Sequence, residues 1–377
     1  MSRRLRSLSR MDIALLAMGS VLALALRFSL ILFESGDYHL FFREWFQAIQ
    51  EQGFTAISSL KYDCTPTYLY LIYGVAVLFP KLAPVVALKL PSIAADFFAA
   101  YLVYRIVRLR YPAGFAPTLA YFAALFAPTI VLNSALWGQT ESIFTAFLLL
   151  CTYLLLSERY DLACLAFGAA FAFKLQAIFL MPLLAALAIK GRLTWKSLLW
   201  IPLVYLALMI PAWIAGRPLA DLLSIYLHQA QSYPALTLNA PTLYAWLPEG
   251  LYAVFLPAGL IWAGSIVFLY LLAIYKSKAL LSRDLVLVLG MLAVLLVPFS
   301  LPKMHERYFY PADMLSIVYG FFFPKHFYIP IAMNLISFFA YQPFLFGRDI
   351  LPMEILALAV LGLLVIVTNK AIDAFYP

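Results

Sequence analysis

The chain has 377 residues, of which 65% are hydrophobic and 12% are charged, and its mean hydropathy is +0.93. A water-soluble protein of this size cannot bury so much apolar surface, so the composition predicts an integral membrane protein with many spans. The apolar runs are continuous rather than alternating, which favours helices over a β-barrel. The net charge of +8 follows from membrane orientation, so no nucleic-acid partner is expected.

The N-terminal segment is predicted to be a retained membrane anchor. An apolar stretch over 11–33 follows four arginines, Arg3, Arg4, Arg6 and Arg10. The stretch is too long for a signal peptide and has no small-residue cleavage site. By the positive-inside rule, the arginines place the N-terminus in the cytoplasm and residue 34 on the outer side.

The next segment, 34–84, is expected to be the first outer loop and to carry interfacial helices. It contains an amphipathic helical pattern that Gly53 ends. Such a helix lies in the membrane interface with its apolar face toward lipid or the bundle. A second interfacial helix is predicted over 66–80, because Pro66 is suited to the start of a helix. The apolar face of the first helix consists of Phe42, Trp45, Phe46 and Ile49.

Two acids of this loop are candidate site residues. Asp37 follows the first predicted span and is expected at the membrane surface. Its side chain is interpreted either as an N-cap, which accepts a backbone hydrogen bond, or as a general base. Asp63 precedes Pro66 and is interpreted either as a turn residue or as a substrate-binding residue. Tyr38, beside Asp37, is a further candidate for substrate binding.

The remaining chain is predicted to form short-looped membrane spans within one all-α integral-membrane domain. A crossing over 85–108 leads to a basic cluster around Arg108, which is expected in the cytoplasm. A second outer loop, 216–249, is rich in aromatic and hydrogen-bonding residues, and the C-terminus is expected in the cytoplasm. With 11–33 and 85–108, about twelve spans are predicted by length, the others being 112–128, 139–156, 161–173, 176–189, 195–214, 251–275, 284–301, 308–323, 326–345 and 350–369.

A dense polar cluster separates two of these spans. Trp137, Gln139 and Glu141 are candidates for substrate binding, although a helix start and an interfacial aromatic belt also explain single members. Glu141 is expected slightly inside the bilayer, where an acid is costly and usually faces a cavity. Lys174 is a lone cation between two short spans. It either snorkels to the interface or contacts a phosphate.

A second charged patch, over 302–311, lies on the predicted outer side against the positive-inside bias. Its potential cations suit the neutralisation of a phosphate, and an arginine can bind a phosphate through two hydrogen bonds. Ionisable residues at membrane depth are functional candidates by default. The candidate substrate-binding residues of this patch are Lys303, His305, Glu306, Arg307 and Tyr308.

In their order along the chain, these segments resemble the GT-C superfamily of integral-membrane glycosyltransferases. The sequence is most similar to bacterial relatives of GPI mannosyltransferases and of dolichyl-phosphate-sugar-dependent glucosyltransferases. The resemblance covers most of the chain, and it rests on Gly36-Asp37 with Trp45 and Gly53, on 62–69, on 136–142, on 173–176 and on 303–309.

The resemblance implies a GT-C-like bundle and a hexosyltransferase in which Asp37 is the catalytic base. The donor would be a polyprenyl- or dolichyl-phosphate-linked monosaccharide, with mannose as the default. The acceptor would be a hydroxyl of a glycan, glycolipid or protein. The implied place is the bacterial inner membrane, with the site on the periplasmic side. Many members carry a paired acid where Asp37 stands alone, so neither a metal nor another cofactor is expected.

Two other hypotheses compete with a glycosyltransferase. A transporter or lipid-carrier flippase would use Asp96, Glu141 and Lys174 to line a path, and it would carry inverted repeats and midplane charges. Only Asp96 is expected to lie deep in the membrane, and no internal repeat is evident. The third hypothesis is a GT-C-like subunit that has the fold but no catalytic activity.

Overall fold

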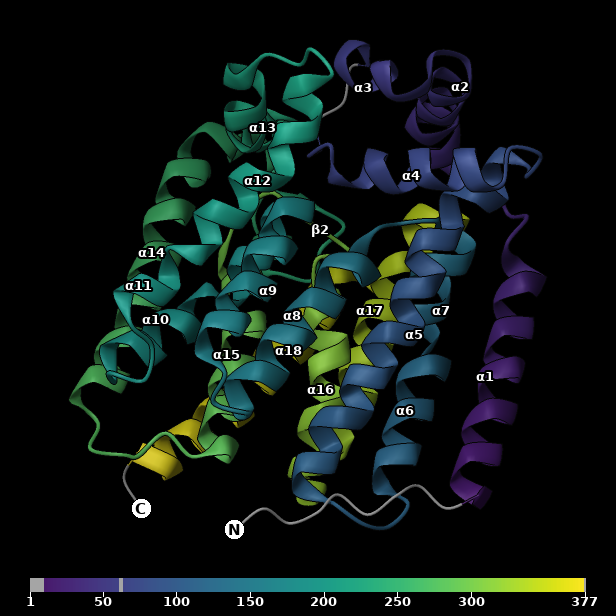
Figure 1. The fold of residues 1–377 in the computed structure, drawn as a ribbon. Coiled ribbons are helices and arrows are strands. Elements are labelled where there is room, and N and C mark those ends of the chain that lie inside the picture. The colour runs from purple at the N-terminus through teal and green to yellow at the C-terminus, as the bar shows by residue number, and fades with distance from the viewer. Residues whose placement is uncertain (1–9, 61–63, 376–377) are drawn as a thin grey trace.

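The outermost helix, α1 (Arg10–Leu30), lies beside a bundle of upright helices (Figure 1). A computed structural model describes residues 10–60 and 64–375 of the chain. Within these residues, seven helices are long and apolar enough to cross a membrane, or eight if one bent pair is a single span. The prediction of an all-α polytopic fold is confirmed, although the described residues also include one short two-stranded sheet.

The long helices differ in how much of their surface lies inside the protein. Only 17% of the apolar window of α1 is buried, against 83% for α15. A mostly apolar helix with so much exposed surface is suited to lipid contact, whereas α15 lies in the bundle core. The long helices after α1 are α5 (Pro84–Arg110), α12 (Trp200–Ile214) with the preceding α11 (Trp195–Leu198), α14 (Tyr252–Lys276), α15 (Arg283–Ser300), α17 (Tyr328–Phe346) and α18 (Met353–Phe375).

Shorter helices fill the space between these spans. The pair α6 (Ala116–Phe126) and α7 (Pro128–Val131) with η3 (Leu132–Trp137) is bent by 49°. Their apolar side chains join one large core with those of α5 and α15. Because some predicted spans correspond to these shorter helices, length alone does not establish a count of about twelve. The other members are α8 (Glu141–Leu156), α9 (Tyr160–Phe173), η4 (Leu175–Leu180), α10 (Met181–Ile189), α16 (Tyr310–Phe322) and η7 (Pro324–His326).

A layer of helices lies across one end of the bundle. Figure 1 shows α4 (Thr67–Leu78) nearly perpendicular to the upright helices, with α2 (Arg43–Gln52) beyond it. The predicted apolar face of α2 is buried, and Gly53 ends the helix with a φ of +64°. The same end carries η1 (Tyr38–Phe42), η2 (Gly53–Thr55), α3 (Ala56–Ser59) and α13 (Leu219–Gln231).

The segment after α13 reaches back to the loop between α15 and α16. It contains β1 (Thr237–Leu238), η5 (Leu243–Trp246) and η6 (Glu249–Leu251). Strand β1 pairs in parallel with β2 (Met304–His305), with Leu238 opposite His305. The backbone amide of Glu306 also donates to the carbonyl of Leu238 at 3.0 Å. The 216–249 segment therefore holds the predicted charged patch in place.

Candidate active site

Asp37 lies at the start of η1, but its side chain does not cap this helix. The backbone amide of Tyr38 donates instead to the hydroxyl of Ser35 at 3.3 Å. The Ser35 hydroxyl in turn donates to the carbonyl of Trp137 at 2.8 Å. The capping interpretation of the Asp37 side chain is therefore wrong, because Ser35 fills that position.

The Asp37 carboxylate is held through one of its two oxygens. Its Oδ2 accepts hydrogen bonds from Trp137 Nε1 at 2.9 Å and from Gln139 Nε2. Among the described residues, no hydrogen bond reaches Oδ1, and the residue is half-buried. The arrangement fixes the orientation of the carboxylate and leaves one oxygen able to accept a proton.

The two donors to Asp37 are placed by a tight turn after η3. Gly138 adopts a left-handed φ of +84°, and the backbone amides of Gly138 and Gln139 both donate to the carbonyl of Asn133. A Cβ atom at position 138 would lie 3.3 Å from two carbons of the Lys89 side chain. Glycine therefore suits both the backbone conformation and the close approach of Lys89.

Lys89 connects this turn to the segment that precedes Asp37. Its buried Nζ donates to the carbonyls of Ile31 at 2.9 Å, Phe33 at 2.6 Å and Leu136 at 2.8 Å. The sequence interpretation missed this residue, although a lone lysine within a predicted span is itself a signal of an unusual role. Lys89 thus fixes the segment that precedes Asp37 relative to the turn that contains Trp137 and Gln139.

A second polar cluster is centred on Arg307. Its guanidinium contacts Glu306 Oε1 at 2.8 Å and Glu141 Oε1 at 3.2 Å. The same Glu141 oxygen accepts a hydrogen bond from Lys174. Glu141 begins α8 and is fully buried, and its Oε2 has no hydrogen-bond partner among the described residues. Lys174 is therefore part of an ion-pair network and does not snorkel to the interface.

Aromatic rings connect the two clusters. The Arg307 guanidinium lies 5.3 Å from the centroid of the Trp137 ring, whose Nε1 donates to Asp37. Tyr308 contacts both cations, with Lys174 Nζ at 5.7 Å and Arg307 Cζ at 5.8 Å from its ring centroid. Such contacts favour cations over the ring face. Trp137 is fully buried, so it does not belong to an interfacial aromatic belt.

His305 lies in the segment between the α15 and α16 helices and is neutral at physiological pH. Burial lowers its pKa to about 2, and the charges of Arg307 and Lys174 act in the same direction. Its Nδ1 lies 3.3 Å from the Arg307 guanidinium, which can only donate, so Nδ1 is the acceptor. The expectation that His305 supplies a cation is therefore wrong. Its neutral ring can instead accept a hydrogen bond from Arg307.

Two further pKa shifts follow from the burial of this segment. Burial raises the pKa of Glu306, although the neighbouring Arg307 acts in the opposite direction. Burial alone would lower the pKa of Arg307, but the Glu306 and Glu141 carboxylates reverse this effect and raise it. Arg307 thus stays charged, whereas Glu306 takes up a proton more readily than an exposed glutamate does.

Two predicted site residues that the structure describes are not part of these clusters. Lys303 Nζ donates to the carbonyl of Ala230 near the end of α13 and, within the described residues, makes no hydrogen bond or ion pair with the Arg307 cluster. Tyr38 is buried in the apolar core formed with α2 and α4. Asp63 lies outside the described residues. The structure therefore brings together Asp37, Trp137, Gln139, Glu141, Lys174, His305, Glu306, Arg307 and Tyr308.

Asp96, the deep acid of the transporter hypothesis, is fully paired. Its Oδ2 accepts from Arg27 Nε at 2.8 Å and from the Ser134 hydroxyl at 2.5 Å. Tyr310 donates to its other oxygen at 3.3 Å. Because Arg27 and Asp96 are both fully buried, the pair joins α1 to α5 within the membrane and does not line an open path.

Comparisons with known proteins identify the fold. Neither the family models nor the curated protein sequences give a match to this chain. Among solved structures, the chain is similar to ArnT from Cupriavidus metallidurans bound to undecaprenyl phosphate, with a TM-score of 0.57 and 14% identity over 95% of this chain and 72% of that chain. The apo form of the same protein gives a TM-score of 0.57 and 13% identity over 96% and 72% of the two chains.

ArnT is a GT-C glycosyltransferase, so the structural likeness agrees with the resemblance found in the sequence. The likeness extends over nearly the whole chain. The protein therefore has the GT-C fold.

Proposed function

We propose that this protein transfers a monosaccharide from a polyprenyl-phosphate-linked donor to an acceptor hydroxyl, with Asp37 as the general base. The observation that carries the proposal is the juxtaposition at Trp137. One side of this residue holds the Asp37 carboxylate at 2.9 Å, and its ring face holds the Arg307 guanidinium at 5.3 Å. A base and a phosphate-binding cation are thereby held close together.

The proposed reaction is a single displacement with inversion at the anomeric carbon. Asp37 Oδ1 accepts the proton of the acceptor hydroxyl while the acceptor oxygen forms a bond to the anomeric carbon. The bond between that carbon and the phosphate oxygen breaks, and the electron pair leaves with the polyprenyl phosphate. The phosphate gains one negative charge in this step, so nearby cations stabilise the transition state more than the ground state.

Arg307 and Lys174 are the proposed phosphate-binding cations. In the structure, Glu306 and Glu141 already pair with them, so the resting cluster balances two cations with two carboxylates. A phosphate must therefore compete with a carboxylate for Arg307. The raised pKa of Glu306 favours its protonation when the phosphate arrives, which would release part of the Arg307 charge.

The likeness to ArnT, whose structure contains undecaprenyl phosphate, supports a polyprenyl-phosphate donor. The hexose, with mannose as the default, is proposed from the sequence resemblance alone. The acceptor is proposed to be a hydroxyl of a glycan, glycolipid or protein. Arg110 and Asp284, 3.3 Å apart, belong to the basic end of the bundle, which the positive-inside rule assigns to the cytoplasm. We therefore assign the site to the outer face.

A transfer assay tests this proposal. Purified protein is incubated with a panel of polyprenyl-phosphate hexoses and candidate acceptors, and the products are identified by mass spectrometry. Asp37→Asn is expected to lower the transfer rate by about 10²- to 10⁴-fold, the usual contribution of a general base. Glu34→Gln is the matched control, because Glu34 is an exposed acid of the same segment that contacts His39 at 3.3 Å.

Three outcomes contradict the proposal. Normal turnover by Asp37→Asn would exclude the base assignment. Absence of product with every donor, despite intact folding, would favour a non-catalytic subunit. Movement of a labelled solute or carrier lipid across liposomes without consumption of donor would favour a transporter or flippase.

A further inference from the structure

A second candidate site lies at the other end of the bundle. It is a cavity of about 230 Å³. The helix α8 begins at Glu141 in the candidate active site and ends at Leu156 in the wall of this cavity. Sixteen residues of helix span about 24 Å at 1.5 Å per residue, so the two sites are separate. The second site is independent of the proposed function.

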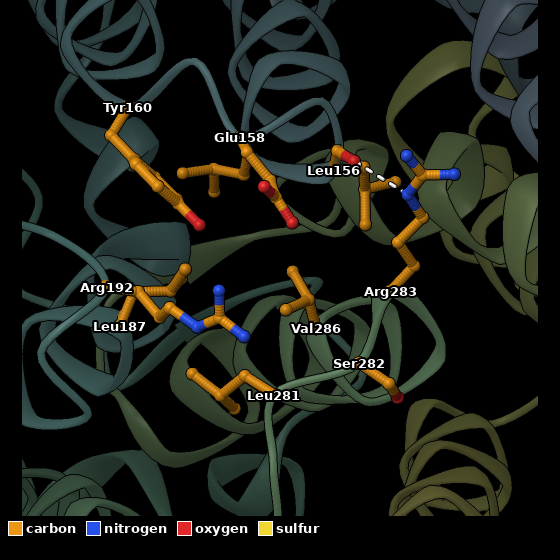
Figure 2. Close-up of a pocket in the computed structure, with 10 residues that line it drawn as sticks. Leu156, Glu158, Tyr160, Leu187, Arg192, Leu281, Ser282, Arg283 and Val286 are labelled. Atoms are coloured by element: carbon orange, nitrogen blue, oxygen red, sulfur yellow. Dashed lines mark hydrogen bonds between the residues drawn. The ribbon is translucent and has the colours of Figure 1, made fainter. Parts of the chain in front are cut away.

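Oppositely charged side chains face this cavity without contacting each other. Figure 2 shows the Glu158 carboxylate and the Arg192 guanidinium pointing into it from opposite sides, with the Tyr160 hydroxyl nearby. Glu158 and Arg192 are both exposed, and within the described residues neither has a side-chain hydrogen bond or ion pair. Arg283, by contrast, is turned outward and donates to the carbonyl of Leu156 at 2.9 Å. The cavity therefore presents one free cation and one free anion.

The backbone holds the carboxylate in this position. Glu158 adopts a left-handed φ of +58° just after Ser157, the C-cap of α8. Glycine is the usual residue at such a position because it has no Cβ. A glycine substitution is thus compatible with the fold and removes the carboxylate, which makes it a useful test.

The surroundings place the cavity at the membrane surface. Two large apolar side chains close in sequence to its lining are strongly exposed, Leu280 at 86% and Trp195 at 82%. Basic side chains occupy the same end, where Lys190 donates to the carbonyl of Ser277. An apolar surface bordered by basic residues is typical of the interface that faces anionic headgroups. This end of the bundle is therefore suited to contact with lipid headgroups.

We propose that this cavity binds the zwitterionic headgroup of a phospholipid that carries a primary amine, as phosphoethanolamine does. The phosphate contacts the Arg192 guanidinium, which can bind it through two hydrogen bonds. The ammonium contacts Glu158. A cavity needs about 10–15 Å³ to hold one water, so the volume of about 230 Å³ accommodates a headgroup of several non-hydrogen atoms.

Lipid retention measured by native mass spectrometry tests this site. Delipidated full-length protein is exposed to equimolar phosphatidylethanolamine and phosphatidylcholine of matched chains, and the retained lipids are counted. The wild type is expected to prefer phosphatidylethanolamine by about tenfold, because a trimethylammonium group cannot donate hydrogen bonds to Glu158. Glu158→Gln and Glu158→Gly are expected to abolish the preference, and Arg192→Gln to reduce retention of both lipids.

The control variant is Lys196→Gln, which removes an exposed cation outside the cavity lining and should leave the preference unchanged. Soluble O-phosphoethanolamine is added in a separate arm to distinguish a lipid from a free source. Equal retention of the two lipids, or variants that behave as the wild type does, would overturn the proposal. Tighter binding of the soluble compound than of the lipid would overturn the lipid assignment.

Discussion

Replacing Trp137 with phenylalanine isolates the contact that orients the proposed base. The substitution removes the Nε1 donor that lies 2.9 Å from Asp37 Oδ2 and retains an aromatic ring beneath Arg307. A hydrogen bond to a charged acceptor contributes about 1.5–3 kcal/mol. Since about 1.4 kcal/mol corresponds to a factor of ten in rate, turnover is expected to fall by about 10- to 100-fold.

The assay measures initial rates against donor concentration at saturating acceptor. The KM for the donor should change little, because the proposed phosphate contacts of Arg307 and Lys174 are kept. The kcat should fall. Trp246→Phe makes the same chemical change at a residue that is 41% exposed, and it should leave both constants unchanged. A normal kcat in Trp137→Phe, or a loss confined to KM, would refute the orienting role.

Three further predictions concern stability. Arg307→Gln leaves the buried Glu306 without its cation and Glu141 with Lys174 alone, and it should lower the free energy of unfolding by about 3–5 kcal/mol. Adding Glu306→Gln should restore part of the lost stability. A double variant that is no more stable than Arg307→Gln would contradict the pairing of Arg307 with Glu306. Lys89→Met should lower the free energy of unfolding by about 3 kcal/mol or more, because three carbonyls lose their donor. A melting temperature equal to that of the wild type would contradict this. Folding lowers the pKa of His305 from 6.5 to about 2, so below pH 6.5 the unfolded chain binds more protons than the folded chain does. The free energy of unfolding should therefore decrease as the pH falls, by about 1.4 kcal/mol per pH unit. His305→Gln should reduce this dependence in unfolding measurements at pH 7 and pH 5, and an unchanged slope contradicts it.

The helices and their order were predictable because their signal is local. The spacing of Phe42, Trp45, Phe46 and Ile49 predicted the amphipathic α2, and all four are buried as expected. Gly53 ends the helix as its conformation requires. A hydrophobic period and a glycine stop depend only on neighbouring residues, so a single sequence contains them.

The charge state and direction of single side chains were not predictable in the same way. His305 lies in β2, and Lys303 directly precedes this strand. The Lys303 side chain nevertheless donates to a carbonyl near the end of α13, whereas burial keeps the His305 ring neutral. Both outcomes depend on the pairing of β1 with β2, which joins distant parts of the chain. Asp37 likewise gained its partners from a segment 100 residues away.

The sequence indicates that Lys89 is unusual, but it does not indicate which groups Lys89 contacts. A lysine in an apolar run points to an unusual environment. Its three acceptors are backbone carbonyls of two other segments, and every residue type supplies a carbonyl. Sequence patterns of side chains therefore cannot identify such partners.

Asp37 and the Arg307 cluster are proposed to form one site for a polyprenyl-phosphate sugar. An experimental structure of the Asp37→Asn variant with an intact polyprenyl-phosphate hexose tests it most directly, because the variant should bind the donor without consuming it. We expect the phosphate within hydrogen-bonding distance of Arg307 or Lys174 and the anomeric carbon facing residue 37. A donor bound elsewhere, with its phosphate far from Arg307 and its sugar away from residue 37, would contradict this assignment.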